Sequence, residues 1–123
     1  MEKQKTLSAS LQNYLKAVYS LHKTDSSVRL VDIAERLSVS KPSVFNAVTQ
    51  LSEMGLAEHV RFGPVLLTAK GIDMAQGLAG RHETIKLFLM RVLGIGESEA
   101  RSEACAIEHI ICDVTLAKMA AMV

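Results

Sequence analysis

Hydrophobic side chains recur every three or four residues near the start of the chain, at positions 11, 15, 18 and 21. This spacing predicts an amphipathic helix that ends near His22, with Ser8 or Ser10 as its amino-terminal cap. Residues 28–30 are expected to form a short strand. A second, shorter helix is predicted over residues 31–37, where the apolar positions again fall on one face.

The third helix is predicted to begin where Ser40 can cap it and Pro42 fits its first turn. It runs to about residue 54, because Gly55 favours the end of a helix. Two short helices joined by a tight turn form a helix-turn-helix. Residues 56–61 and 65–67 then flank the Phe62-Gly63-Pro64 turn and predict a β-hairpin, the wing of such a domain.

The rest of the pattern is helical. Thr68 can cap a long helix over residues 69–93, Gly94 and Gly96 interrupt it, and two further helices are expected over residues 97–111 and from Asp113 to the end. The predicted fold class is therefore mainly α with a small β-wing. A winged helix-turn-helix occupies residues 1–71, and a helical domain follows over residues 72–123.

Composition fits this picture. Hydrophobic residues make up 49% of the 123 residues and Trp is absent, which favours helices packed by aliphatic side chains. No signal sequence and no membrane-length apolar run is present, so we expect a cytoplasmic protein with reduced cysteines and no membrane partner. Residues 1–71 carry nine Lys/Arg against six Asp/Glu, and residues 72–123 carry five against seven. The excess of positive charge in residues 1–71 suits binding to phosphates, and the excess of negative charge in residues 72–123 suits binding to a cation.

The candidate chemistry lies in Cys105, Glu108 and His109. On a helix, positions i, i+3 and i+4 share a face, so a thiolate, a carboxylate and an imidazole would converge there. Such a mixed donor set suits first-row transition ions better than calcium or magnesium. His82, from a second cluster at residues 81–83, could complete the coordination. The alternatives are a solvated Glu-His pair and a buried, inert cysteine.

The third helix carries the candidate DNA contacts. Val44, Val48 and Leu51 form its buried stripe, which leaves the polar side chains on the outer face. Asn and Gln can pair with adenine in the major groove, whereas Ser and Lys suit phosphates. Phe45 would meet a thymine methyl, a partner subunit or a neighbouring helix. The candidate DNA-binding residues are Ser40, Lys41, Pro42, Ser43, Phe45, Asn46 and Gln50, with Arg61 on the wing.

Six motifs in this order resemble one known family. They are NYLKAVY (13–19), VDIAERL (31–37), SKPSV (40–44), LTAKG (67–71), RHE (81–83) and EACAIEH (103–109). Together they are similar to the diphtheria toxin repressor and manganese transport regulator family, in its short two-domain form. The resemblance implies a homodimer, a winged helix that binds a palindromic operator in double-stranded DNA, and a second domain that dimerises and helps to bind metal. It implies no enzymatic activity.

By this resemblance His82, Cys105, Glu108 and His109 occupy ligand positions, and Asn13 occupies the ligand position of the first helix. The thiolate of Cys105 favours Fe(II) over Mn(II), while Zn, Co or Ni could bind in vitro.

Three cations depart from the family pattern, since Lys16, Lys86 and Arg101 stand where relatives place further ligands. Their charge opposes a second ion, so we expect one divalent transition-metal ion per subunit. Lys16 or Lys86 could instead pair with Glu83 or Glu108.

The function expected is a metal-dependent transcriptional regulator of iron or manganese homeostasis, acting as a repressor. Metal bound between Asn13 and the second domain would fix the reading heads about one DNA turn apart. One alternative is a metal-independent or redox-sensing winged-helix regulator that uses Cys105. A zinc hydrolase is disfavoured because no general base lies near the cluster. His22 and His59 are expected on the surface, and Cys112 is expected in the core. The homodimer is expected to form through Leu87, Leu89, Val92, Leu93 and the last helices.

Overall fold

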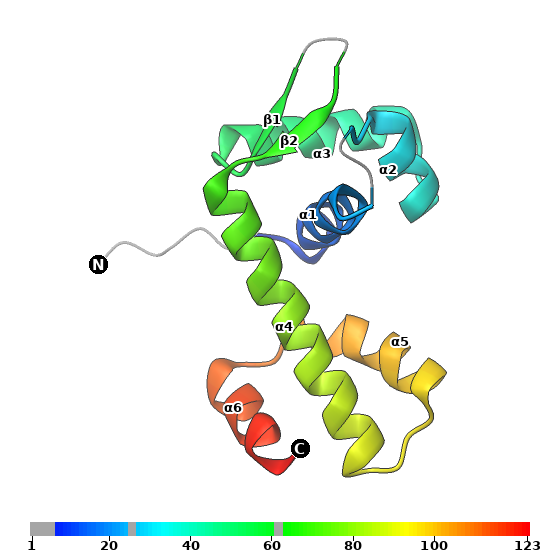
Figure 1. The fold of residues 1–123 in the computed structure, drawn as a ribbon, viewed down its shortest axis with the longest axis vertical. Coiled ribbons are helices and arrows are strands. Elements are labelled where there is room, and N and C mark those ends of the chain that lie inside the picture. Colours follow the sequence, from blue (N-terminus) through cyan, green and yellow to red (C-terminus); the bar gives the residue numbers. More distant parts are fainter. Residues whose placement is uncertain (1–6, 25–26, 61–62) are drawn as a thin grey trace, which may run out of the picture. The chain divides into compact units, whose positions relative to one another are not determined.

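The computed structural model describes residues 7–24, 27–60 and 63–123, which form six helices and one two-stranded sheet (Figure 1). The chain folds into two compact units, residues 1–75 and 76–123. The long helix α4 (Ala69–Arg91) begins in the first unit and ends in the second. The prediction of a mainly α fold with a small β-wing is confirmed. No helix of the described ranges has the length and hydropathy needed to span a membrane.

The first unit contains α1 (Ala9–His22), α2 (Leu30–Leu37) and α3 (Lys41–Glu53), followed by the strands β1 (Ala57–His59) and β2 (Val65–Leu67). The strands pair antiparallel, with Ala57 opposite Leu67. Aliphatic side chains from every one of these elements fill the core; among those that are fully buried are Leu15, Val18, Ile33, Val44, Val48, Leu51, Leu56 and Val65. Helix α3 and the two strands of the wing therefore share one hydrophobic core.

Serine caps set the helix starts where the sequence indicates. The hydroxyl of Ser8 accepts the backbone N–H of Leu11 at 3.2 Å, and that of Ser40 accepts the N–H of Ser43 at 3.3 Å. Each bond satisfies one of the amide groups that the first turn of a helix leaves open. The start of α3, on which the candidate DNA residues depend, is therefore fixed by local chemistry.

The prediction of a short strand at residues 28–30 is wrong. The side chain of Asp32 accepts the backbone N–H of Arg29 at 2.9 Å, and this cap starts α2 already at Leu30. Val28 keeps one strand-like contact, because its carbonyl accepts the N–H of Val65 at 2.7 Å. The segment therefore lies along β2 with a single hydrogen bond.

The wing is tied to the start of α4 by Thr68 and Gly71. The Thr68 hydroxyl donates to the carbonyl of Gly55 at 2.7 Å and accepts the N–H of Gly71 at 3.0 Å. A Cβ atom at Gly71 would lie 2.0 Å from the Leu56 carbonyl oxygen. The backbone of α4 can pass this close to the wing only because residue 71 has no side chain.

The second unit packs the end of α4 against α5 (Glu97–Ile107) and α6 (Asp113–Met122). Ile85, Leu89, Ala100 and Ala104 form its buried core, and partly buried residues of α6, Leu116 and Met119, pack against them. The expected helix over residues 97–111 is too long, since α5 ends at Ile107 and a turn follows. The expected end of α4 at residue 93 is also late, because Gly94 takes a positive φ of 73° after a helix that stops at Arg91.

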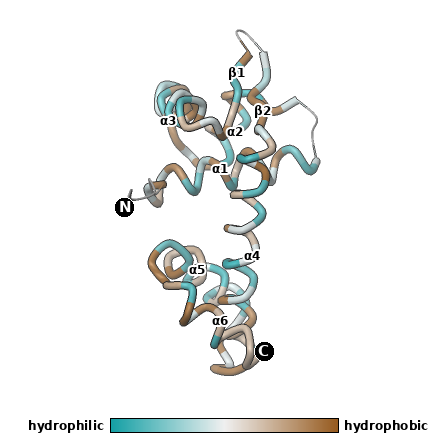
Figure 2. Tube along the Cα trace, turned by 90° about the vertical axis from the view of Figure 1, so that its left-hand side faces the viewer, coloured by the Kyte–Doolittle hydropathy of each residue, from teal (hydrophilic) through white to brown (hydrophobic). Residues whose placement is uncertain are grey.

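Two expectations about burial in this unit are corrected. Leu89 belongs to the core and so is not a surface available to a partner. Cys112 is exposed at the amino-terminal cap of α6, because the helical region breaks before it. Helix α6 is largely apolar (Figure 2), yet none of its residues is buried. The large exposed apolar residues of this unit are Val92, Leu93, Ile110, Val114, Met122 and Val123.

Candidate metal centre and nucleic-acid interface

A buried carboxylate lies at the centre of the second unit's polar residues. Glu108 is the one charged residue that is buried among those the structure describes, and its side chain has no exposed surface. Its Oε1 atom lies 2.9 Å from Nδ1 of His82, on α4, and its Oε2 atom lies 3.7 Å from Nε2 of His109. A carboxylate is costly to bury without charged or hydrogen-bonding partners, and His82 provides a hydrogen bond here, whereas Nε2 of His109 lies beyond hydrogen-bonding distance of Oε2.

Arg81 holds the chain segment that carries two of these three residues. Its Nε atom donates to the Glu108 carbonyl at 3.1 Å, and its guanidinium also donates to the Ile111 carbonyl and, at 3.0 Å, to the Asp113 carboxylate. A planar guanidinium offers several donors in fixed directions and so can join three acceptors at once. The connection between α5 and α6 is thereby fastened to α4, one residue before His82.

The other expected ligands are placed differently. Cys105 is exposed on α5, and Asn13 lies half-buried on α1 in the first unit. The structure brings His82 and His109 close to Glu108, and the roles of all five residues as metal ligands stay predictions. Within residues 7–24, 27–60 and 63–123, no three His, Cys, Asp or Glu side chains already have the arrangement that holds a metal ion. His82 and Glu108 instead bind each other directly.

The cations that depart from the family pattern engage nearby acids. The Lys86 ammonium lies 3.6 Å from the Glu83 carboxylate, one turn earlier on α4, which agrees with the pairing considered from the sequence. Arg101 forms an exposed pair with Glu97 at 2.8 Å. Ion pairs at the surface contribute little to the free energy of folding, but they give the carboxylates of Glu83 and Glu97 a cationic partner.

The donor set around Glu108 fits a transition-metal ion. Imidazole nitrogen with carboxylate oxygen, half-buried or buried on a scaffold of two helices, is a combination that first-row divalent ions bind. All three side chains belong to the second unit and are held by α4 and the end of α5. The residues are compatible with a bound ion in chemistry and in burial.

Cys112 is a separate thiol at the start of α6. The Thr115 hydroxyl lies 3.3 Å from its sulfur, and this hydrogen bond, aided by backbone amides of the first turn, lowers the pKa of the Cys112 thiol. This position differs from the core position expected for Cys112, because Cys112 is the amino-terminal cap of α6.

Helix α3 presents the expected polar side chains to solvent. Lys41, Pro42, Ser43, Asn46 and Gln50 are exposed, while its buried face consists of Val44, Ala47, Val48 and Leu51. The hydroxyls of Ser40 and Ser43 bind each other at 2.9 Å. Arg61, the expected wing contact, lies outside the described residues. The outer face of α3 is thus mainly polar, with Phe45 exposed among these side chains.

Phe45 and His59 connect α3 to the wing. Their ring centres lie 6.1 Å apart at an interplanar angle of 71°, an edge-to-face contact. Of the partners considered for Phe45 from the sequence, the structure provides a neighbouring element, although the element is a strand and not a helix. The expectation that His59 is a plain surface residue is corrected, since it is half-buried against this ring.

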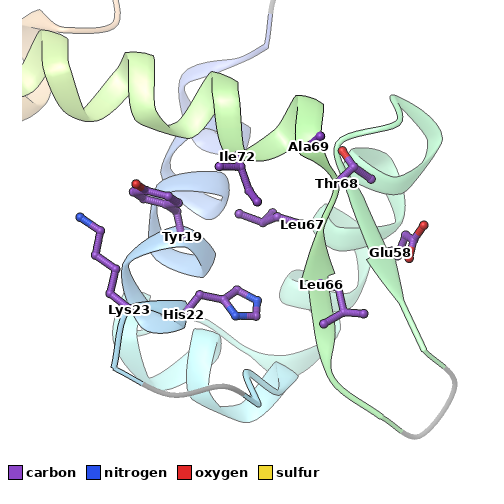
Figure 3. A pocket seen from close by; sticks show the side chains of 9 residues that line it. All are labelled: Tyr19, His22, Lys23, Glu58, Leu66, Leu67, Thr68, Ala69 and Ile72. Carbon is purple, nitrogen blue, oxygen red and sulfur yellow. The ribbon is translucent and has the colours of Figure 1, made fainter.

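His22 is also more than a surface residue. Its Nε2 atom donates to the carbonyl of Val65 at 3.0 Å and so ties α1 to β2. It lines a hollow of about 660 Å³ in the first unit, where Leu67 and Ile72 contribute apolar surface (Figure 3). Figure 3 shows the His22 ring reaching from α1 toward β2. The imidazole is thus used to support the wing.

Comparison with known proteins identifies a DNA-binding domain and a metal-binding domain in this chain. Residues 6–63 match the family described as "Iron dependent repressor, N-terminal DNA binding domain". Residues 68–123 match "Iron dependent repressor, metal binding and dimerisation domain". An uncharacterised HTH-type transcriptional regulator of Methanocaldococcus jannaschii is 31% identical over 92% of this chain and 91% of its own length. The transcriptional regulator MntR of Escherichia coli O6:H1 is 36% identical over 86% of this chain and 68% of its own length.

Solved structures give the same result. The manganese regulator SloR has a TM-score of 0.80 at 33% identity, covering 91% of this chain and 52% of its own. A manganese-dependent transcriptional repressor in complex with manganese has a TM-score of 0.83 at 31% identity, with 91% and 51% covered. The chain spans about half the length of these solved chains. With both domains matched in order, the resemblance drawn from the motifs is confirmed, and the chain belongs to the iron dependent repressor family of metal-dependent transcriptional regulators.

Proposed function

We propose that this protein is a cytoplasmic repressor that binds a palindromic operator as a homodimer when each subunit holds one divalent iron or manganese ion. The observation that carries the proposal is the buried Glu108 carboxylate with an imidazole at each oxygen. His82 of α4 and His109 of the turn after α5 lie near this one charged group, in the part of the chain that matches a metal-binding and dimerisation domain.

The proposed ligands are His82, Glu108 and His109, joined by Cys105 and by Asn13 of the first unit. A bound divalent ion would supply positive charge and fixed coordination directions at the buried carboxylate. Two nitrogens, a carboxylate oxygen and a thiolate favour Fe(II) slightly over Mn(II), because sulfur is the softer donor. An imidazole binds a metal ion through a neutral ring nitrogen, so protons and the ion compete for ligands of this kind.

The proposed effect of metal on operator binding depends on ligands that come from both units. Asn13 lies on α1, in the same unit as α3, whereas the other proposed ligands lie in the second unit. Ligands drawn from both units restrict how α3 is placed in the dimer, and operator binding then no longer has to supply that ordering. A coupling free energy of about 1–3 kcal/mol suffices, which corresponds to roughly 5- to 150-fold in affinity.

The experiment that tests this function is an operator titration under anaerobic conditions. A binding sequence is first selected from random duplexes with metal-loaded wild type, and its affinity is then measured with Fe(II), with Mn(II) and with a chelator. We expect a loss in chelator of the size given above, and Cys105→Asp should shift the preference toward Mn(II). Equal affinity in all three conditions would assign the chain to the metal-independent regulators instead.

Two exposed residues of α3 should behave differently on DNA. Asn46→Ala is expected to relax base preference at one position at a cost of about 1–3 kcal/mol, because its amide can pair with a base edge. Lys41→Ala should weaken binding to all sequences alike and reduce the slope of log affinity against log salt by about one. Both are measured by titrations on the selected and a random duplex. Equal losses on both duplexes for both variants would show that Asn46 does not read a base.

The dimer is expected to form through the exposed apolar residues of the second unit. Leu93, Ile110 and Val114 are 57%, 84% and 66% exposed, and large apolar side chains exposed in one small unit suit a subunit interface. Light scattering should therefore give a dimer at tens of micromolar with metal present. Val114→Glu should give a monomer, while Ser102→Glu, which adds the same charge at an exposed polar position of α5, should not. A monomeric wild type would remove the basis for paired half-sites.

A further inference from the structure

Phe45 is a large apolar residue on the polar face of α3. Its side chain is 50% exposed, although the buried face of the helix is complete without it. Single exposed apolar residues are common on protein surfaces, so exposure alone has no functional meaning. The informative observation is that the ring is held in place.

His59 holds it. The histidine is the last residue of β1, where it pairs with Val65 across the sheet, and its ring meets the Phe45 ring edge to face at 6.1 Å and 71°. This is a preferred arrangement of two aromatic rings, and it restricts the rotation of Phe45 about its side-chain bonds. The contact therefore favours one orientation of the exposed half of the phenyl ring.

The polar neighbours of Phe45 are partly committed elsewhere. Thr49, one turn further along α3, donates its hydroxyl to the Phe45 carbonyl at 2.8 Å, and the Ser40 and Ser43 hydroxyls bind each other. Asn46, the next residue, is exposed on the same helix. The centre of this surface therefore combines an amide with a fixed apolar ring.

We propose that Phe45 reads one thymine of the operator by contact with its C5 methyl group, and that His59 is the positioning residue for the ring. In the major groove thymine is the base that presents a methyl group, and an apolar side chain is its complement. Helix-turn-helix proteins place the amino-terminal part of the recognition helix against base edges, and Phe45 is in the second turn of α3. The proposal rests on the DNA-binding function proposed above.

The test replaces single thymines of the selected operator by uracil, which removes the methyl group and nothing else. With metal-loaded wild type, one symmetrical replacement should weaken binding by roughly four-fold for each half-site, the effect of one buried methyl group. Phe45→Ala should be insensitive to that same replacement, and Phe45→Leu should keep part of the sensitivity. The expected result is thus a coupling between one protein side chain and one methyl group.

His59 is tested through the same readout. His59→Ala should reduce the uracil effect without changing affinity for the uracil operator, and His59→Phe should restore it, because a second aromatic ring can again meet Phe45. Glu58→Ala is the matched control, since Glu58 is the exposed neighbour on β1 and should leave the uracil effect at the wild-type value.

Two results would overturn the proposal. One is an equal uracil effect, or none at any thymine, in wild type and Phe45→Ala. The other is a His59→Ala variant that loses affinity for thymine and uracil operators alike, which would make the ring pair a purely structural contact between wing and helix. In both cases wild type still binds its operator with metal, so the regulator function stands. A wild type that binds no duplex would remove that function first.

Discussion

Replacing Glu108 with alanine should abolish the effect of metal on operator binding. The carboxylate lies between the imidazoles of His82 and His109, so its removal deletes a proposed ligand and the group that holds the two others together. We expect the affinity of the variant with Fe(II) or Mn(II) to equal that of wild type in chelator, a loss of up to roughly 150-fold. Weak binding to any DNA should persist, because α3 is in the other unit.

The controls separate ligation from folding. Glu108→Gln keeps the volume and a hydrogen-bond acceptor for His82 but removes the charge, so it should also lose the metal response while retaining more stability. Glu83→Ala removes an exposed carboxylate that pairs with Lys86 and should respond to metal as wild type does. A Glu108→Ala variant that is folded and still stimulated by metal would place the metal site elsewhere in the chain.

Gly71→Ala should be the most destabilising small substitution in the first unit. The added Cβ would lie 2.0 Å from the Leu56 carbonyl oxygen, and neither atom can rotate away, because the Cβ position is set by the α4 backbone and the oxygen belongs to the backbone itself. Either α4 or the wing must move, which would also strain the two hydrogen bonds of Thr68. We expect a loss of about 3 kcal/mol or more in the free energy of unfolding, and a fall in Tm of more than roughly 10 °C.

Gly77→Ala is the matched variant for that measurement. It lies on the same helix, but its added Cβ would meet nothing within 4 Å. Alanine is the better helix former by about 1 kcal/mol, so thermal unfolding should shift to the same or a higher temperature. If the two variants unfold at similar temperatures, the contact between α4 and the wing is not as tight as the geometry indicates.

The helix starts were predictable because their causes are local. Ser8 and Ser40 cap α1 and α3 through side-chain bonds that span three residues, and such bonds leave a recognisable pattern in the sequence. The wing followed in the same way from Gly63 and Pro64 between two apolar runs. The early start of α2 was missed although its cause is also local, because Asp32 caps it from three residues inside the helix.

The end of α5 was not predictable, because its cause is distant in the sequence. Neither Gly nor Pro follows Ile107, and the pattern continues as a helix to residue 111. The turn is instead held by Arg81, whose guanidinium takes the carbonyls of Glu108 and Ile111 from 27 and 30 residues away. The same break exposes Cys112, which a continuous helix would have left within the packed region. Spacing therefore predicted candidate donor residues, while the arrangement of Glu108 and His109 depends on a tertiary contact.

The position of Arg81 next to His82 has a consequence for the kinetics and energetics of metal uptake. Because the guanidinium already holds the backbone of the segment that bears Glu108 and His109, this segment does not have to be ordered by an arriving ion. The binding free energy is then not reduced by the entropy of ordering a loop, in contrast to small metal domains that fold only around their ion. With the proposed ligands, the second unit would therefore release and rebind metal without unfolding, as a reversible sensor requires.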